Sequence, residues 1–224
     1  MKKSQFMIMD YPGLVKYFAS PNPLFLLFFV IPLFSFFLYF TLQSVMNPFL
    51  IVAGIFYWTL LEYLIHRFIY HTHFSNKIFY YFFGSFHLYH HKNMADHRIL
   101  NAGFIMVFIL APFFVSPVLL ITRDSGVWGS VGLGLTIGYY FYECVHYILH
   151  YKVYEKGYLN YIQKYHLYHH DRGPQKNFGN TSHFWDMIFG TYDARYRDYE
   201  IPESTRKTFI TQKKVTFSHV EARS

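Results

Sequence analysis

Long apolar segments alternate with polar ones along this chain, and their lengths predict membrane-spanning helices. No charged residue occurs between Lys16 and Glu62. A polar break at 43–47 divides this stretch into two apolar runs, 23–42 and 48–65. Because about 20 apolar residues cross the hydrocarbon core of a bilayer, the two runs predict a helical hairpin.

A second pair of apolar runs has the same organisation as the first. The runs 102–121 and 127–149 are separated by the polar sequence TRDSG at 122–126. Pro32 and Pro112 lie inside the runs, and membrane helices tolerate such kinks where the freed carbonyls find partners. We therefore expect an all-α integral membrane protein with four transmembrane helices arranged as two hairpins.

The composition agrees with a membrane protein. Of the 224 residues, 53% are hydrophobic and 23% aromatic, and only 15% are charged, compared with about 25% in an average soluble domain. The single cysteine, Cys144, excludes an internal disulfide and any metal site built from cysteines alone.

The positive charges predict the orientation in the membrane. Of the 20 lysines and arginines, only Arg123 lies in a predicted hairpin turn. By the positive-inside rule, the N-terminal segment and the segments 66–101 and 150–224 face the cytoplasm. Both termini are then cytoplasmic, in a bacterial inner membrane or the endoplasmic reticulum. The net charge of +7 follows this topology, and no separate basic stripe indicates a nucleic-acid partner.

The predicted organisation is one membrane domain over residues 1–224. Segments 66–101 and 150–192 are expected to form a helical cap on the cytoplasmic side. The mixed-charge segment 193–224 is expected to be a polar cytosolic tail.

Histidines are the unusual feature of the chain. The pentapeptide HLYHH occurs at 87–91 and again at 166–170. Each copy is preceded by a histidine pair, and the four clusters contain His66, His71, His87, His90, His91, His146, His150, His166, His169 and His170. Positions i, i+3 and i+4 share a face of a helix, so each pentapeptide is expected to point three imidazoles in one direction.

The two histidine pairs have different spacings. His146 and His150 lie one turn apart and share a face. His66 and His71 diverge by roughly 140° on an α-helix. They are therefore expected to serve two different ions, or the helix breaks between them.

The clusters form an internal repeat. Sixteen residues separate His71 from His87, and sixteen separate His150 from His166. Each half thus consists of a hairpin, a histidine pair at the cytoplasmic end of the hairpin and the three histidines of one pentapeptide. Two such halves could enclose two metal ions. Neutral imidazole is the commonest metal ligand and suits zinc, copper, iron and nickel.

The number and place of the histidines favour an oxygen-activating site. A structural zinc site closes at four ligands, so ten are too many for one. Two redox metals beside the lipid phase suit the oxidation of an unactivated C–H bond. Glu62 and Glu143, each near the inner end of a span, are candidates to orient ligand histidines through their free N–H groups. His73, His97, His183 and His219 fall outside the repeat and are expected at the surface or behind the ligands.

Three stretches resemble the fatty acid hydroxylase superfamily of integral-membrane di-metal oxygenases, which includes sterol desaturases. They are WTLLEYLIHRFIYH (58–71), YYFYECVHYILHY (139–151) and KYHLYHH…NFGNTSHFWDMIFGTY (164–192). The likeness covers roughly residues 48–192 and is closest to the fatty acid 2-hydroxylase branch. It implies four transmembrane helices beneath a cytosolic helical cap, and hydroxylation of a fatty acid next to its carboxyl carbon.

The resemblance also implies a ligand set and partners. One ion would be held by His66, His87, His90, His166 and His169, and the other by His71, His91, His146, His150 and His170. Iron is expected for activity with O₂, although zinc could occupy the site in a purified sample. Some relatives carry a fused cytochrome b5 domain. This chain lacks its His-Pro-Gly-Gly haem motif, so a separate cytochrome b5-like or ferredoxin-like donor is implied.

Two further carboxylates are candidates to support the ligands. Asp96 follows the first pentapeptide, and Asp186 lies in the closing motif, where it could buttress a ligand histidine. The neighbouring Phe184 and Trp185 could instead anchor the cap at the headgroup level, where aromatic residues concentrate.

Other functions remain open on the sequence alone. Within the superfamily, they are a sterol or alkane oxidase and a lipid desaturase, which share the first hydrogen abstraction with a hydroxylase. More distant are a membrane zinc hydrolase, whose His-Glu-x-x-His motif is absent, and a metal-handling protein, whose ligands would lie at mid-membrane.

Overall fold

The fold is helical throughout the part of the chain that can be described. The computed structural model describes residues 23–43, 47–72, 74–76, 80, 84–94, 96, 100, 112–113 and 115–211. Its helices are α2 (Pro23–Leu42), α3 (Pro48–Leu64), η1 (Ile65–Tyr70), α5 (Ser85–Lys92), α7 (Ser125–Leu149), α8 (Gly157–Asp171), α9 (Phe184–Ile188), η4 (Ala194–Asp198) and α10 (Glu203–Arg206). Within these residues no strand occurs, which confirms the predicted all-α class.

The first two apolar runs form long helices. Helix α2 has the bounds of the predicted run, and α3 continues without a break into η1, so that the second helix ends at Tyr70. Among the described residues, these two helices are long and apolar enough to cross a membrane. Their outer faces are exposed: 74% of the surface of Phe28 and 83% of that of Phe49 is accessible. Apolar surface of this size is expected to face lipid.

The second predicted hairpin is described in part. Residues 122–124 are not helical, and Asp124 caps α7 by accepting hydrogen bonds from the amides of Gly126 and Val127 at 2.8 and 3.1 Å. Helix α7 contains the whole predicted run 127–149. Most of the predicted run 102–121 lies outside the described residues; inside it, 115–121 are helical.

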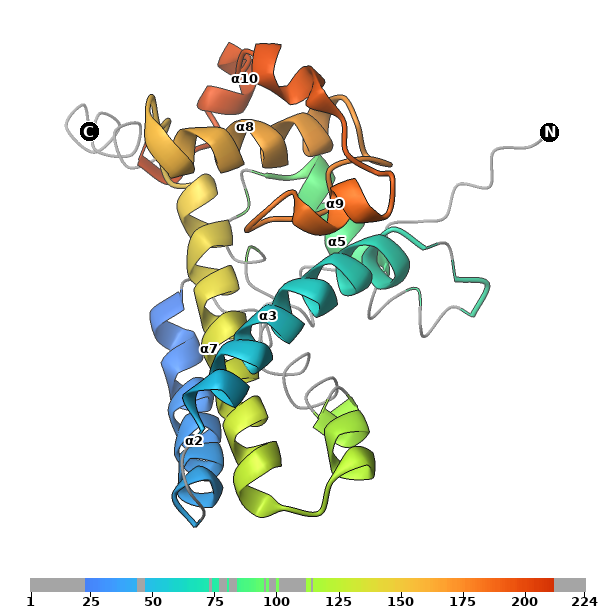
Figure 1. Ribbon diagram of the computed structural model, residues 1–224. Coiled ribbons are helices and arrows are strands. Elements are labelled where there is room, and N and C mark those ends of the chain that lie inside the picture. Colours follow the sequence, from blue (N-terminus) through green and yellow to red (C-terminus); the bar gives the residue numbers. More distant parts are fainter. Residues whose placement is uncertain are drawn as a thin grey trace.

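Helix α7 packs against both α2 and α3, and glycine makes the close approach possible. A Cβ atom on Gly54 of α3 would lie 2.3 Å from the carbonyl oxygen of Val131, and one on Gly134 of α7 would lie 2.1 Å from that of Ile51. The two helix backbones therefore touch at Gly54 and Gly134, as small residues allow in membrane helix pairs. Figure 1 shows α2 beside α7, with α3 crossing them.

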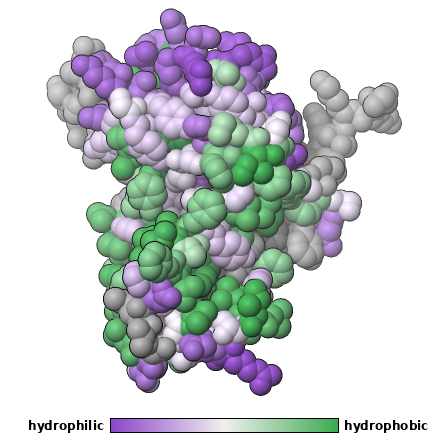
Figure 2. All heavy atoms as spheres, in the orientation of Figure 1, coloured by the Kyte–Doolittle hydropathy of each residue, from purple (hydrophilic) through white to green (hydrophobic). Residues whose placement is uncertain are grey.

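The remaining helices gather at the C-terminal end of α7. Helices α8, α9 and α10 lie there together with α5 (Figure 1). A core that includes Leu149, Ile162, Tyr165 and Phe209 holds this end together. Its surface is polar, whereas the opposite half of the molecule is apolar (Figure 2). The ends of α3 and α7 therefore deliver their histidines to the junction between an apolar and a polar half.

Candidate metal centre

The ten histidines of the repeat form two compact groups. In each group, one ring nitrogen from every member lies within 4.8 Å of those from the other four. The first group is His66, His71, His87, His91 and His169, and the second is His90, His146, His150, His166 and His170. The rings of His91 and His170 stack with their centroids 3.9 Å apart, so the two groups are neighbours.

A π-helix brings His66 and His71 into the same group. Segment η1 is a π-helix, and the amide of His71 donates to the carbonyl of His66 at 3.2 Å, an i to i+5 bond. In this wider turn, residues five apart lie on one side of the helix. The prediction that the two histidines serve different ions is thus wrong, and the helix changes its pitch between them.

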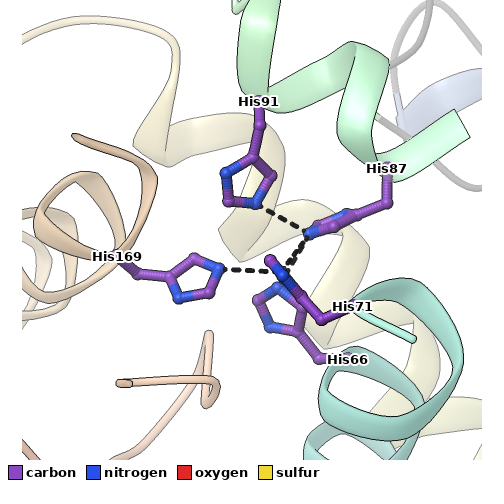
Figure 3. A group of neighbouring side chains, drawn as sticks. All are labelled: His66, His71, His87, His91 and His169. Carbon is purple, nitrogen blue, oxygen red and sulfur yellow. Dashed lines mark hydrogen bonds between the residues drawn. The ribbon is translucent and has the colours of Figure 1, made fainter. Parts of the chain in front are cut away.

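The first group converges on a common point through its Nε2 atoms. The Nε2 atom of His87 lies 2.9 Å from that of His66, 3.1 Å from that of His71 and 2.9 Å from that of His91. The Nε2 atoms of His169 and His71 are 3.1 Å apart. Figure 3 shows the five rings entering from α5, α8 and the end of η1 with their nitrogens turned inward.

These contacts cannot all be hydrogen bonds. The Nδ1 atom of His66 contacts the carbonyl of Phe178, and that of His169 contacts the carbonyl of Lys176 at 2.6 Å. A carbonyl only accepts, so both Nδ1 atoms carry the proton and both Nε2 atoms present a lone pair. Lone pairs therefore face one another across the first group, and a bound cation would remove their repulsion.

The histidines outside the spans are held in their neutral form. Burial lowers the pKa of His71 to about 3 and that of His169 to about 4. Burial also lowers the pKa values of His87, His166 and His170 well below the ordinary histidine value, and neighbouring imidazoles add to the effect. Neutral imidazole is the form that binds metals.

The second group has the same features. The Nε2 atoms of His150 and His166 are 3.0 Å apart. The Nδ1 atom of His166 donates to the side-chain oxygen of Asn180 at 2.9 Å, which leaves its Nε2 lone pair toward the group. Among the described residues, neither ring nitrogen of His170 has a hydrogen-bond partner, although both are buried. Buried polar atoms normally have a partner, so this set of neutral nitrogen donors also fits a metal ion.

The two halves of the repeat exchange one histidine. His90 is the middle histidine of the first triple, and it lies in the second group. His169 is the middle histidine of the second triple, and it lies in the first group. The other four members of the first group come from the first half of the repeat, and the other four members of the second group come from the second half. The structure therefore groups His71, His90, His91 and His166 differently from the ligand sets that the family resemblance implies.

The loop 177–181 supports one histidine in each group. Through Phe178 it accepts from His66 of the first group, and through Asn180 it accepts from His166 of the second. Asn177, which begins the loop, has a φ of 58°, a left-handed conformation that asparagine tolerates well. These contacts were not predicted, although the loop lies in the closing motif of the sequence.

Two of the predicted carboxylates hold this loop and not a histidine. The buried Glu62 accepts from the amides of Asn180 and Thr181 at 2.5 and 2.8 Å and from the Thr181 hydroxyl at 2.7 Å. Asp186 accepts from the amides of Phe178 and Gly179 at 2.9 and 2.8 Å. The expectation that Glu62 and Asp186 bind ligand histidines directly is therefore wrong, because backbone donors occupy them.

The other two predicted carboxylates lie near the groups. Asp96 accepts from the hydroxyl of Tyr89, the tyrosine of the first pentapeptide, at 3.3 Å. In the second pentapeptide the matching Tyr168 donates to Asp193 at 3.0 Å, so both tyrosines bind an aspartate, although the two aspartates are not at matching positions of the repeat. Glu143 is fully buried on α7, three residues before His146.

The histidines outside the repeat play no part in the two groups where the structure describes them. His183 contacts the hydroxyl of Tyr161 through its Nδ1 atom, away from both groups. His73, His97 and His219 lie outside the described residues. Trp185 donates to the hydroxyl of Thr59 at 2.9 Å and lies against Phe56, which ties α9 to the side of α3.

Comparisons with known proteins agree with the site. The ceramide very long chain fatty acid hydroxylase scs7 of Schizosaccharomyces pombe is 35% identical over 144 residues, which cover 62% of this chain and 41% of the relative. A dihydroceramide fatty acyl 2-hydroxylase of Arabidopsis thaliana is 35% identical over 147 residues, which cover 63% of this chain and 60% of the relative. The fatty acid 2-hydroxylase of Homo sapiens is 33% identical over 150 residues, which cover 65% of this chain and 40% of the relative.

A solved structure shares the fold. The structure of full-length scs7p, in which only the hydroxylase domain is visible, matches with a TM-score of 0.60 and 32% identity over 77% of this chain and 65% of that one. The chain thus spans less than two thirds of the length of these relatives. Residues 51–191 match the family described as fatty acid hydroxylase, and this stretch contains all ten grouped histidines. The protein belongs to the fatty acid hydroxylase family.

Proposed function

We propose that this protein is a membrane oxygenase that hydroxylates a fatty acyl chain, at carbon 2, with O₂ and two electrons from a separate donor. The observation that carries the proposal is the pair of five-histidine groups in a member of this family. The relatives named as fatty acid or dihydroceramide fatty acyl 2-hydroxylases support the substrate class and the position. The substrate would be a free fatty acid or the acyl chain of a sphingolipid.

Each group of five histidines would hold one metal ion. Iron is the metal that we expect for activity, and zinc could occupy the same nitrogen ligands in a purified sample. A bound pair of iron ions would supply the redox chemistry that activates O₂ toward an unactivated C–H bond. Zinc has no redox chemistry, so a zinc-loaded sample should be inactive.

The chain's own residues would fix the ligands and keep water away. The carbonyls of Phe178 and Lys176 set the protonated nitrogen of two ligands in the first group. The ring of Tyr70 stacks on His87, and that of Tyr142 stacks on His146, with centroids 4.9 and 6.0 Å apart. Such support keeps a ligand set in one geometry. The burial of these groups supports a reaction in a site closed to bulk water.

The arrangement in the membrane is also part of the proposal. The proposed spans are 23–42, 48–65, 102–121 and 127–149, beneath a cytosolic cap from 66–101 and 150–192 and followed by the tail 193–224. Both termini would be cytoplasmic, with all of 1–224 forming one domain of a bacterial inner-membrane or endoplasmic reticulum protein. The exposed apolar faces of α2 and α3 and the polar surface around α8 and α10 support this arrangement.

The electrons would come from a separate protein, of the cytochrome b5 or ferredoxin type. Arg172 and Arg195 are paired with Asp171 and Asp193 within the chain. The exposed side chains of Arg197 and Arg206 favour an acidic partner. Charge complementarity of this kind raises the rate of encounter between two proteins. Charge-reversed variants of these arginines should slow reduction by an acidic donor, with a loss that shrinks at high salt.

Labelling with ¹⁸O₂ tests the reaction. Cells that express the protein should make a 2-hydroxy fatty acid carrying one labelled oxygen, as read by mass spectrometry of their hydrolysed lipids. His87→Ala and His166→Ala remove one ligand from each group and should abolish the product. A new double bond, a hydroxylated sterol or an unlabelled product would contradict the proposal and favour another reaction of the superfamily.

A further inference from the structure

An apolar pocket lies among the helices of the apolar half. Its volume is about 570 Å³, within the range of about 300–1,000 Å³ that is usual for ligand pockets. Six of its lining residues come from one stripe of α2, three from 112–119 and one from α7. They are Phe28, Phe29, Pro32, Leu33, Phe36, Phe37, Pro112, Val115, Leu119 and Trp128. All ten side chains are apolar or aromatic, so the pocket suits an alkyl chain.

The pocket opens toward lipid on one side, and the half-buried Trp128 lies at one end. Phe28 and Phe36 form an exposed rim, at 74% and 52%, on the outer face of α2. Phe37 is buried, and Trp128 packs against Phe40 with ring centroids 4.4 Å apart. An acyl chain can therefore enter sideways from the bilayer and end against Trp128.

The axis of the pocket points toward the second histidine group. Trp128 and His146 are 18 residues apart on α7, which is five full turns at 3.6 residues per turn, so both lie on the same face. At a rise of about 1.5 Å per residue, they are about 27 Å apart along the helix. The pocket and the histidines thus share one side of the same helix.

Along the axis of α7, the other end of the pocket lies nearer to the histidines. Phe37 packs on Gly132, and Val30 lies in one cluster with Tyr139, so α2 runs antiparallel to α7. This register places Phe28 of the rim only one to two turns before His146 along α7. A chain that ran from the histidines through the pocket to Trp128 would be about 27 Å long. One leaflet of a bilayer core is about 15 Å thick.

We propose that this pocket holds the distal part of the substrate's acyl chain and that Trp128 forms its end and limits chain length. The inference rests on the proposed acyl hydroxylation, and it identifies the substrate class as long chains that extend beyond one leaflet. The carboxyl end lies at the cap beside the histidine groups, and the methyl end lies against Trp128. The lengths that fit are set by the distance between these two ends.

Tryptophan fluorescence tests the pose without turnover. The chain has three tryptophans, so Trp58→Phe with Trp185→Phe leaves Trp128 as the only tryptophan, which can be excited selectively over the tyrosines. The protein in nanodiscs of unbrominated lipid is titrated with a very long-chain saturated fatty acid brominated at its methyl end, or with one brominated near its carboxyl end. The methyl-end bromine should quench Trp128 strongly and the carboxyl-end bromine weakly. The unbrominated acid should relieve the quenching.

The matched control keeps Trp185 as the only tryptophan. It lies on α9 against α3 and should show weak quenching that the unbrominated acid does not relieve. Equal quenching of Trp128 by both acids, or quenching that no competitor relieves, would mean only partition into the bilayer and would overturn the proposal. Stronger quenching by the carboxyl-end bromine would mean a separate lipid in the opposite orientation and would also overturn it.

Product analysis provides a second test. Trp128→Ala opens the end of the pocket, and Val115→Phe narrows it. The first should shift the products toward longer chains and the second toward shorter ones, by about ten-fold in the ratio of the two, as single-methylene discrimination allows. An unchanged length profile in both variants would refute the role of Trp128. Absence of any hydroxylated product from the unaltered protein, with the quenching pattern intact, would refute the proposed function and leave the pocket standing.

Discussion

Replacement of Glu62 by alanine should release both histidine groups at once. Glu62 accepts three hydrogen bonds from the loop 177–181, which starts 115 residues later in the chain. It is 4% exposed, and its partner residues Asn180 and Thr181 are 2% and 9% exposed. Solvent can therefore replace few of these bonds unless the loop opens.

The size of the effect follows from the three lost bonds. Each buried donor left without an acceptor costs about 1–3 kcal/mol. A water molecule in the space left by the side chain can satisfy part of the loss, so we expect a net destabilisation of about 3–6 kcal/mol. This is a large fraction of the about 5–15 kcal/mol that stabilises a typical protein.

The loss should reach the metals through two specific contacts. The loop accepts from His66 in the first group and from His166 in the second. When the loop moves, both imidazoles lose the partner that fixes their tautomer. Purified Glu62→Ala protein should therefore bind less of both metals, measured by elemental analysis and by the visible absorption of the cobalt(II)-substituted protein.

Conservative variants separate positioning from general damage. In Glu62→Gln, one oxygen can still accept from the two backbone amides, and the new amide can donate to the Thr181 hydroxyl, so metal content and cobalt spectrum should recover. Thr181→Val loses one of the three bonds and should show a partial effect. The exposed Glu200→Ala should change stability by less than about 0.5 kcal/mol. If Glu62→Ala kept two metals per chain with an unaltered spectrum, or lost metal from one group only, the reasoning would be refuted.

Three further predictions concern the groups and the helix packing. Removal of metal with a chelator should lower the melting temperature, because lone pairs of neutral imidazoles then face one another. The metal-free protein should lose stability as the pH falls from about 6.5 to about 4, because histidines of the unfolded chain take up protons before those of the folded protein. In the folded protein the pKa of His71 is lowered to about 3 and that of His169 to about 4. A melting temperature that does not depend on pH would contradict this prediction. Gly134→Ala should already cost at least about 2 kcal/mol in chemical unfolding, because its Cβ atom alone would lie 2.1 Å from the Ile51 carbonyl oxygen, and Gly134→Val should cost more.

The helices could be predicted from the sequence because their signal is local. The run 23–42 became α2 with unchanged bounds, and the whole run 127–149 lies inside α7. Both helix predictions need only the length of an apolar segment and the polar residues that end it. The start of α7 moved to Ser125 because Asp124 caps the helix, a detail that apolar content does not contain.

The composition of the two groups could not be predicted in the same way. The ten histidines were identified from their spacing, and all ten lie in the two groups. Their division depends on the π-helical turn between His66 and His71 and on the relative placement of α5 and α8. Neither follows from residue spacing on an ideal α-helix, where positions five apart diverge.

The role of Glu62 was missed for a related reason. Sequence spacing places it one turn before His66 and therefore suggests a direct contact with a histidine. In the structure the Nδ1 atom of His66 is already paired with the carbonyl of Phe178. The carboxylate instead binds backbone amides of the distant loop. Almost every residue type has a backbone amide, so the sequence does not indicate which amides a carboxylate binds.

The exchange of His90 and His169 has a consequence for how the centre forms. Each half of the repeat carries four histidines of its own group and one of the other. A half that folded alone would bring together four imidazoles of one group, while its exchanged histidine would be without its group. Burying imidazoles without a partner is costly, so neither half gains its full ligand set until α5 and α8 lie side by side. The loop 177–181 adds a second link, because it supports one histidine of each group. Loss of one link should therefore weaken both groups, and the two sites should fill and empty together rather than independently.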